Sequence, residues 1–246
     1  MSTNWVTATL VAVSLMVAPS LMVAQNPPPQ RAPEPGGQPE AASPPPAYKP
    51  PLRGAPGGRV GGASRGTVKP VTPLATIDLL APDGHSGLTA SATPTLYFYV
   101  SRRVNYPTRL TISAPRQPLP IIEANIPSPL AAGIYAVRLG DYRVRLDTGL
   151  VYTWSVSIIL NPDTPSRDVV ASASLLRVPP DPNFEAAVRA APAPRRTALF
   201  ADAGLWYDAV AAAADLDQHA ALAELLSEVG LDRLVGASVR SGEAVK

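Results

Sequence analysis

The stretch that decides the fold class is VYTWSVSIIL, residues 151–160. Large apolar side chains recur in it at every second position and share one face: Tyr152, Trp154, Val156, Ile158 and Leu160. Small polar side chains occupy most of the positions between them. A period of two residues is typical of a β-strand with one buried face. The stretch therefore predicts a strand of a β-domain, with Trp154 in its core.

Seven further segments around this stretch have the short length and the bounding turn residues of strands. They are Ala75–Leu80, Thr95–Val100, Arg109–Ser113, Ile121–Asn125, Gly133–Leu139, Asp141–Asp147 and Val169–Val178. No helical periods separate them. A succession of short strands without intervening helices is typical of an antiparallel sandwich. We predict a mainly β protein in which residues 57–180 form an antiparallel, immunoglobulin-like β-sandwich.

After the last strand, the apolar residues change to helical spacing. Asp181 is placed to cap a helix over 182–190, and Pro192 is placed to end it. Three more helical segments are expected: 195–202, 205–216 and 219–228. We predict that residues 181–235 form a helical tail packed on the sandwich and that residues 236–246 are disordered.

The N-terminal part of the chain has the composition of an export segment and a tether. Residues 6–23 are apolar or small and uncharged, which indicates a signal peptide over 1–24, either cleaved or retained as a membrane anchor. Residues 25–56 are rich in proline and poor in apolar side chains, and such a segment stays extended and disordered. We predict an exported protein, periplasmic or extracellular, with membrane contact only through an uncleaved N-terminal segment.

The composition also excludes several classes of site. The chain has no cysteine and two histidines, which excludes disulfides, thiolate zinc sites and multi-histidine metal centres. Its formal charge of +2 has no dense basic stripe, so we expect no nucleic acid as partner. Residues 62–66 match the G-x-S-x-G pattern, but no strand precedes them and prolines follow, which does not fit a nucleophile elbow. We predict no catalytic residues, no metal and no cofactor.

Aromatic residues are the candidates for binding. Tyr97 and Tyr99 share one face of their predicted strand, where they would either stack on a sugar ring or be covered by another element. In the helical tail, Leu205, Trp206 and Tyr207 form an apolar cluster that is a candidate for contact with a partner protein. Two groups of polar residues have both a structural and a functional interpretation. The loop Asn161–Asp168 is either a turn or a calcium site, and the arginines at 102, 103, 143 and 145 form either a solvated face or an anion patch.

Several stretches in the same order resemble a bacterial family known as domain of unknown function 928. They are Gly58–Gly66, Gly87–Thr89, Pro94–Val100, Tyr152–Ser155 with Ile158-Ile159, Arg177-Val178, Ala203–Ala209 and Val229–Leu231. The resemblance covers residues 57–235 and implies an exported protein with a β-rich domain, without implying an activity. Many members carry two cysteines at places where this chain has Thr67-Val68 and Leu160-Asn161.

These observations favour a non-catalytic envelope protein that binds another envelope protein or a glycan. The first hypothesis is a protein-interaction module, which rests on the tether and on the missing catalytic constellation. The alternative is a carbohydrate- or polysaccharide-binding module, which rests on the sandwich and on the pair Tyr97 and Tyr99 and is otherwise an analogy of fold.

Overall fold

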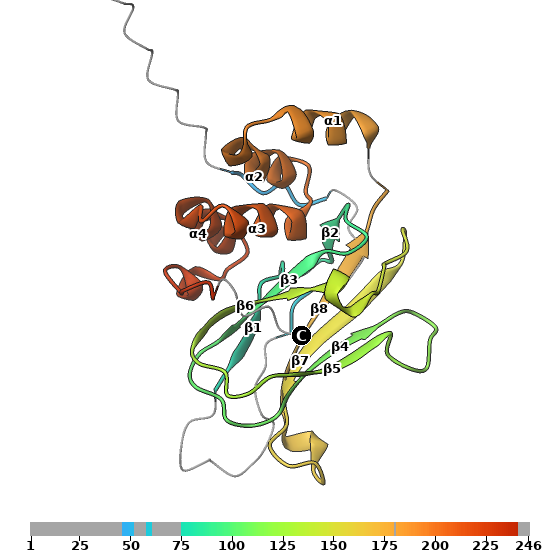
Figure 1. Ribbon diagram of the computed structural model, residues 1–246, viewed down its shortest axis with the longest axis vertical. Helices are drawn as coiled ribbons and strands as arrows, with labels where there is room; N and C mark the ends of the chain where they lie inside the picture. The colour runs from blue at the N-terminus through green and yellow to red at the C-terminus, as the bar shows by residue number, and fades with distance from the viewer. Residues whose placement is uncertain (1–45, 52–57, 61–74, 180, 241–246) are drawn as a thin grey trace, which may run out of the picture. The chain divides into compact units, whose positions relative to one another are not determined.

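Strand β7 (Val151–Ile158) pairs with neighbours on both sides in the larger of two sheets (Figure 1). This sheet has five strands in the order β2-β8-β7-β4-β5. The other four are β2 (Gly87–Thr89), β8 (Val169–Arg177), β4 (Thr108–Ser113) and β5 (Ile122–Ile126). The alternation of β7 has the predicted effect: Trp154 and Val156 are fully buried, while Thr153 is exposed.

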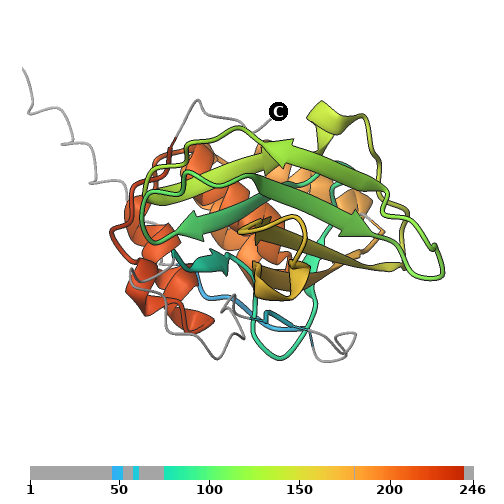
Figure 2. The same ribbon diagram turned by 90° about the horizontal axis from the view of Figure 1, so that it is seen from below.

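The second sheet has three strands in the order β1-β3-β6. They are β1 (Ile77–Leu79), β3 (Thr95–Val100) and β6 (Gly133–Arg138), and both pairings are antiparallel. Residues of both sheets belong to one buried core, which includes Phe98 of β3 and Trp154 of β7. Figure 2 shows the strands from below, with the C-terminal helices in orange and red. The computed structural model describes residues 46–51, 58–60, 75–179 and 181–240. The predicted signal peptide and most of the predicted linker therefore lie outside the described residues.

The strand order resembles that of immunoglobulin sandwiches. The orders β8-β7-β4-β5 and β1-β3-β6 correspond to strands G-F-C-C′ and A-B-E of that fold. Near the start of β7, the Tyr152 hydroxyl accepts a hydrogen bond from the Asp147 N–H at 2.9 Å. This contact is similar to the tyrosine corner at the same place of immunoglobulin domains. One pairing differs from the prediction, because β2 runs parallel to β8 and the sheet is therefore mixed.

The predicted set of strands needs two corrections. The segment Asp141–Asp147 is not a strand: a 3-10 turn (η1, Leu139–Tyr142) begins before it, and Arg143 has a left-handed backbone with φ of 57°. The alternation still describes burial, because Leu146 is buried, Tyr142 and Val144 are half-buried against the core, and the residues between them are exposed. Conversely, β2 was not predicted, because its three residues have neither the length nor the alternation of a strand.

Four helices follow the sheets, close to the predicted positions. They are α1 (Pro182–Ala190), α2 (Ala193–Asp202), α3 (Trp206–Asp215) and α4 (His219–Glu228), and 3-10 turns lie at Pro165–Arg167 (η2) and Asp232–Leu234 (η3). The Asp181 carboxylate caps α1 by accepting the N–H groups of Asn183 and Phe184. Of the residues that the structure describes, none forms a helix long and apolar enough to cross a membrane.

Two segments predicted to be disordered are packed on the domain. Residues 46–51, which belong to the predicted linker over 25–56, lie against the helices, where Tyr48 is buried. Residues 236–240 belong to the C-terminal segment predicted to be disordered, but Val239 forms a parallel bridge with Ile134 at the free edge of β6. The unpaired backbone of an edge strand attracts such pairing. The domain therefore extends to residue 46 at its N-terminal side and to residue 240 at its C-terminal side.

Candidate functional site

The three residues predicted to contact a partner lie inside the molecule. Leu205, Trp206 and Tyr207 have exposed fractions of 5%, 0% and 1%. The Trp206 indole N–H donates to the Leu80 carbonyl at 2.9 Å, directly after β1. These side chains therefore join the helices to the sheets, and the prediction that they form a partner surface is corrected.

The tyrosine pair on β3 is largely covered as well. Tyr97 is 3% exposed and Tyr99 is half-buried. Burial raises the pKa of Tyr97 above its usual value, and the nearby Asp215 carboxylate at the end of α3 acts in the same direction. Helix α3 contacts β3 and covers this face of the strand. A stacking platform of two tyrosines is therefore not available at the surface.

One buried pair fixes α3 on the five-stranded sheet. The Trp154 indole N–H donates to the Tyr207 hydroxyl at 2.9 Å, and this hydroxyl donates to the Ser174 carbonyl at 3.2 Å. The two rings meet edge to face with centroids 6.4 Å apart. Because both polar groups are satisfied in a dry core, the pair stabilises one orientation of α3 on the sheet.

A short N-terminal segment, Pro46–Pro51, crosses the helices, and we call it the strap. Its Tyr48 ring is 8% exposed and packs edge-on against Trp206, with centroids 4.9 Å apart. The Tyr48 hydroxyl lies 2.8 Å from His85 Nε2, and the Tyr48 N–H donates to the Glu228 carboxylate at 2.6 Å. One tyrosine thus contacts a loop, α3 and α4, so the strap has a defined position.

Lys49 continues the strap along α2. Its N–H donates to the Ala201 carbonyl at 3.1 Å, and its ammonium group pairs with Asp202 at 2.8 Å. Gly204 has a φ of +71°, and a Cβ there would lie 2.7 Å from the Lys49 carbonyl oxygen. A side chain at position 204 would therefore collide with the strap. We call the residues that receive the strap the strap groove: His85, Ala201, Asp202, Trp206 and Glu228.

A separate apolar cavity lies beside α1, and we call it the α1 groove. It has a volume of about 350 Å³, and its apolar walls are Ala90, Phe184, Val188 and Phe200. Phe184 of α1 and Phe200 of α2 meet edge to face with centroids 5.9 Å apart. Ser91 and Asp208 complete the lining, with Glu185 and Arg189 of α1. An apolar cavity with a few polar groups is the usual form of a binding site.

Asp208 joins the α1 groove to the sheets. It lies in the first turn of α3, and its carboxylate accepts the Ala90 N–H at 3.0 Å. Burial raises the pKa of Asp208 to about 6, although hydrogen bonds from Ala90, Thr89 and Ser91 act in the opposite direction. The carboxyl group is thus protonated in the folded protein at a pH where it is ionised in the unfolded chain.

This difference predicts that stability depends on pH through Asp208. The folded pKa of about 6 exceeds the usual 3.8, so the free energy of unfolding should fall by about 2 kcal/mol as pH rises from 4 to 7. Asp208→Asn keeps an oxygen for the Ala90 N–H and cannot ionise. We expect urea unfolding at several pH values to show this fall in the wild type and to lack it in the variant.

The exposed carboxylate of Asp163 provides the matched control. Asp163→Asn should keep the pH dependence of the wild type, because this side chain is exposed in a turn. An Asp208→Asn variant with the same slope as the wild type would show that Asp208 is not responsible.

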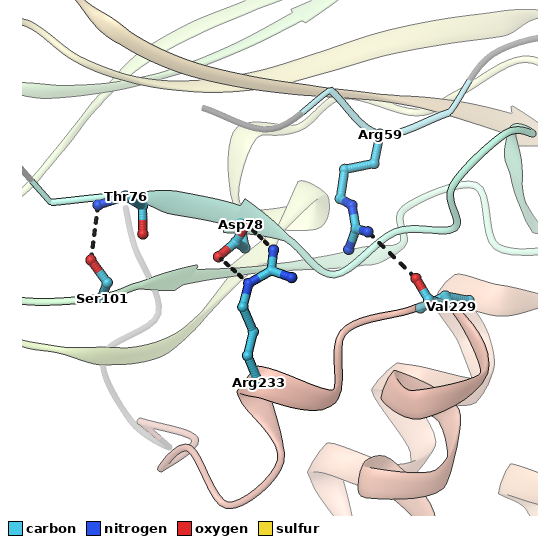
Figure 3. Close-up of polar contacts among 6 residues, drawn as sticks. All are labelled: Arg59, Thr76, Asp78, Ser101, Val229 and Arg233. Carbon is cyan, nitrogen blue, oxygen red and sulfur yellow. Dashed lines mark hydrogen bonds and ion pairs between the residues drawn. The ribbon is translucent and has the colours of Figure 1, made fainter. Parts of the chain in front are cut away.

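Figure 3 shows a second polar cluster, between β1 and the C-terminal helices. The Arg233 guanidinium pairs with the buried Asp78 carboxylate at 2.6 Å. Arg59 comes from the segment before the sheets and donates to the Val229 carbonyl at 3.4 Å. Burial lowers the pKa of Arg59, and the nearby Arg233 charge adds to this effect. The cluster therefore ties the helical part to β1 and has the form of a structural clamp.

The other candidate sites have structural contacts or lie outside the described residues. Asn161 and Asp168 use side-chain oxygens to accept the N–H groups of Asp163 and Leu160, as in an ordinary turn. In the described ranges there is no group of three or more potential metal ligands. The G-x-S-x-G residues 62–66 lie outside the described residues. The α1 groove was not predicted, although Phe184 and Val188 are four positions apart and such spacing puts two side chains on one helix face.

Comparison with known proteins identifies one family. Residues 60–239 match the model of a family described as Domain of Unknown Function (DUF928). This match spans both sheets and helices α1 to α4, and it confirms the resemblance to this family that the sequence indicates. No curated protein and no solved structure gives a significant match to the chain.

Proposed function

Because this chain belongs to the DUF928 family, whose description assigns no activity, we propose its function from the α1 groove. We propose that the protein is a non-catalytic interaction module of the cell envelope. In this proposal, the α1 groove binds an apolar segment of another envelope protein. The proposal includes export, for which the uncharged apolar residues 6–23 are the support.

The single observation that carries the proposal is the half-covered apolar side of α1. This helix is described over its full length and buries none of its nine side chains. Phe184 and Val188, four positions apart, are only half-buried and line the α1 groove. A helix in a domain normally covers its apolar stripe. An apolar stripe left open beside a cavity is typical of an interaction site.

The lining of the groove indicates the chemistry of the partner. The centre is formed by two phenylalanines and a valine, which favour one or two large apolar side chains. Glu185 and Arg189 lie one turn apart on α1 and contribute one charge of each sign, and the Asp208 carboxyl adds an acidic group, so an acidic segment is not favoured. A segment with an apolar centre and polar flanks fits this lining.

We expect Val188→Asp to abolish capture of the partner. The tagged full-length chain is crosslinked and recovered from the separated envelope fraction of the cell that produces it, which also tests the location. A buried charge without a counter-ion opposes docking of an apolar segment by several kcal/mol. The expected result is one reproducible protein with the wild type and at least a tenfold loss with the variant.

Ala186→Asp is the matched control, because Ala186 is exposed on the other side of α1. It adds the same charge to the same helix and should leave capture unchanged. Equal loss with both variants would show that the charge of α1, and not the groove, is responsible. Recovery of glycan without a specific protein would contradict the proposal and support the carbohydrate alternative.

A further inference from the structure

The strap lies on the helices as a bound peptide would. Its six residues contain no helix or strand, and one side chain, Tyr48, fills the strap groove. Side chains and backbone from a loop, α2, α3 and α4 receive it: His85, Ala201, Asp202, Trp206 and Glu228. An aromatic anchor, two backbone hydrogen bonds and an ion pair are the elements of peptide recognition in a groove.

The strap is held separately from the chain that follows it. Residues 58–60 have their own contacts: the Arg59 N–H donates to the Pro82 carbonyl at 3.1 Å. Val60 exchanges two hydrogen bonds with Ser172 on β8, at 2.7 and 3.1 Å. None of these bonds involves the strap groove. The strap can therefore leave its groove while the sheets keep every strand pairing.

The strap contacts also permit release. The Lys49–Asp202 ion pair is exposed, with 67% and 53% of the side-chain surfaces accessible. Exposed ion pairs contribute little free energy to the binding of a segment. Tyr48 is the only aromatic side chain of the strap, Pro46 is the only other buried one, and the exposed Ala47 and Pro50 add little buried surface. The binding thus depends on two buried residues, as in weak peptide complexes.

We propose that the strap groove is a peptide-binding site that also accepts the strap of a second copy of this chain. The ligand class is an extended, proline-flanked peptide with the sequence Tyr-Lys. Every copy carries the same ring, N–H groups and ammonium group, so exchange keeps all the contacts of the strap while it joins two molecules. Residues 52–57 connect the strap to Gly58 and span at most about 25 Å, so the two domains must lie side by side.

The cysteine-free sequence makes this exchange directly measurable. One full-length chain carries Lys49→Cys and another carries Asp202→Cys, and the two are mixed with a short bis-maleimide. A link between positions 49 and 202 of different chains forms only where the strap of one chain occupies the groove of the other. We expect a covalent heterodimer whose yield rises with protein concentration, because the strap of the same chain competes at an effective concentration of about 1 mM.

Three controls separate exchange from random contact. A partner with Asp163→Cys, an exposed residue of a turn, should give at least about tenfold less heterodimer, because no docking raises its local concentration. Adding Tyr48→Ala to the Lys49→Cys chain should remove the link. A synthetic peptide of residues 44–53 should compete, whereas the same peptide with alanine at position 48 should not.

Two results would overturn the proposal. The first is an equal yield with Asp202→Cys and with Asp163→Cys, which would show collisions without docking. The second is no heterodimer at any concentration while the Lys49→Cys/Asp202→Cys double variant links within one chain. That second result would show that the strap binds only its own domain.

Discussion

Replacement of Trp206 by alanine is expected to lower the free energy of unfolding by about 3–5 kcal/mol. The indole is fully buried, so its removal leaves a large cavity between α3 and the sheets. It also leaves the Leu80 carbonyl without the indole N–H. Urea unfolding followed by far-UV circular dichroism measures the change. The total free energy of unfolding of a domain of this size is about 5–15 kcal/mol, so the variant would be close to unfolding at 37 °C.

Two variants test the reason for this loss. Trp206→Phe keeps most of the apolar ring but not the N–H, and the unpaired Leu80 carbonyl should cost about 1–3 kcal/mol. Tyr106→Ala removes an aromatic side chain that is 48% exposed and should change stability by less than about 0.5 kcal/mol. A loss at Trp206 no larger than the loss at Tyr106 would mean that α3 does not pack on the sheets as described.

Tyr207→Ala is the second substitution with a large expected effect, again about 3–5 kcal/mol. The ring is buried between Trp154 and Gly87, and its hydroxyl is the hydrogen-bond partner of the Trp154 indole. Tyr207→Phe isolates the hydroxyl and should cost about 1–3 kcal/mol, because the indole N–H is left unpaired in the core. Chemical unfolding of both variants separates the ring from its hydroxyl.

Gly87 allows an independent test of the Tyr207 ring. A Cβ at position 87 would lie 2.6 Å from Tyr207 Cε2, so Gly87→Ala should cost about 1–3 kcal/mol by overpacking. In a Tyr207→Ala background the ring is absent, and the same substitution should then cost less, because only the contact with Pro82 Cδ at 3.2 Å remains tight. Additive effects in the double variant would contradict the direct contact between the two residues.

Local signals account for most of what the sequence predicts correctly. The Asp181 cap and the proline at 192 define α1, and the alternation in 151–160 defines β7. The misses depend on partners far away in the sequence. Strand β2 exists only because β8 pairs with it, and the strap is ordered by Glu228, which is 180 residues away. No local pattern contains such a partner.

At the candidate site, too, local patterns could be read from the sequence, whereas contacts between distant residues could not. Sequence reasoning selected Tyr97, Trp206 and Tyr207 as binding residues, whereas the structure buries all three side chains. Alternation in β3 separates two faces, and only the position of α3 decides that Tyr97 is buried and Tyr99 is half-exposed. The α1 groove combines residues of α1, α2, α3 and a loop after β2. The sequence shows the spacing of Phe184 and Val188, but it does not show a cavity between four segments.

The bond between Trp206 and Leu80 also has a consequence for the time course of synthesis. Their separation of 126 residues means that Leu80 leaves the ribosome about 6–25 s before its partner does, at ordinary rates of translation. During this interval the side of the sheets that α3 covers has nothing to pack against. Contacts between residues so distant in the chain also slow folding itself. The nascent chain thus remains without a complete core until its last quarter is made.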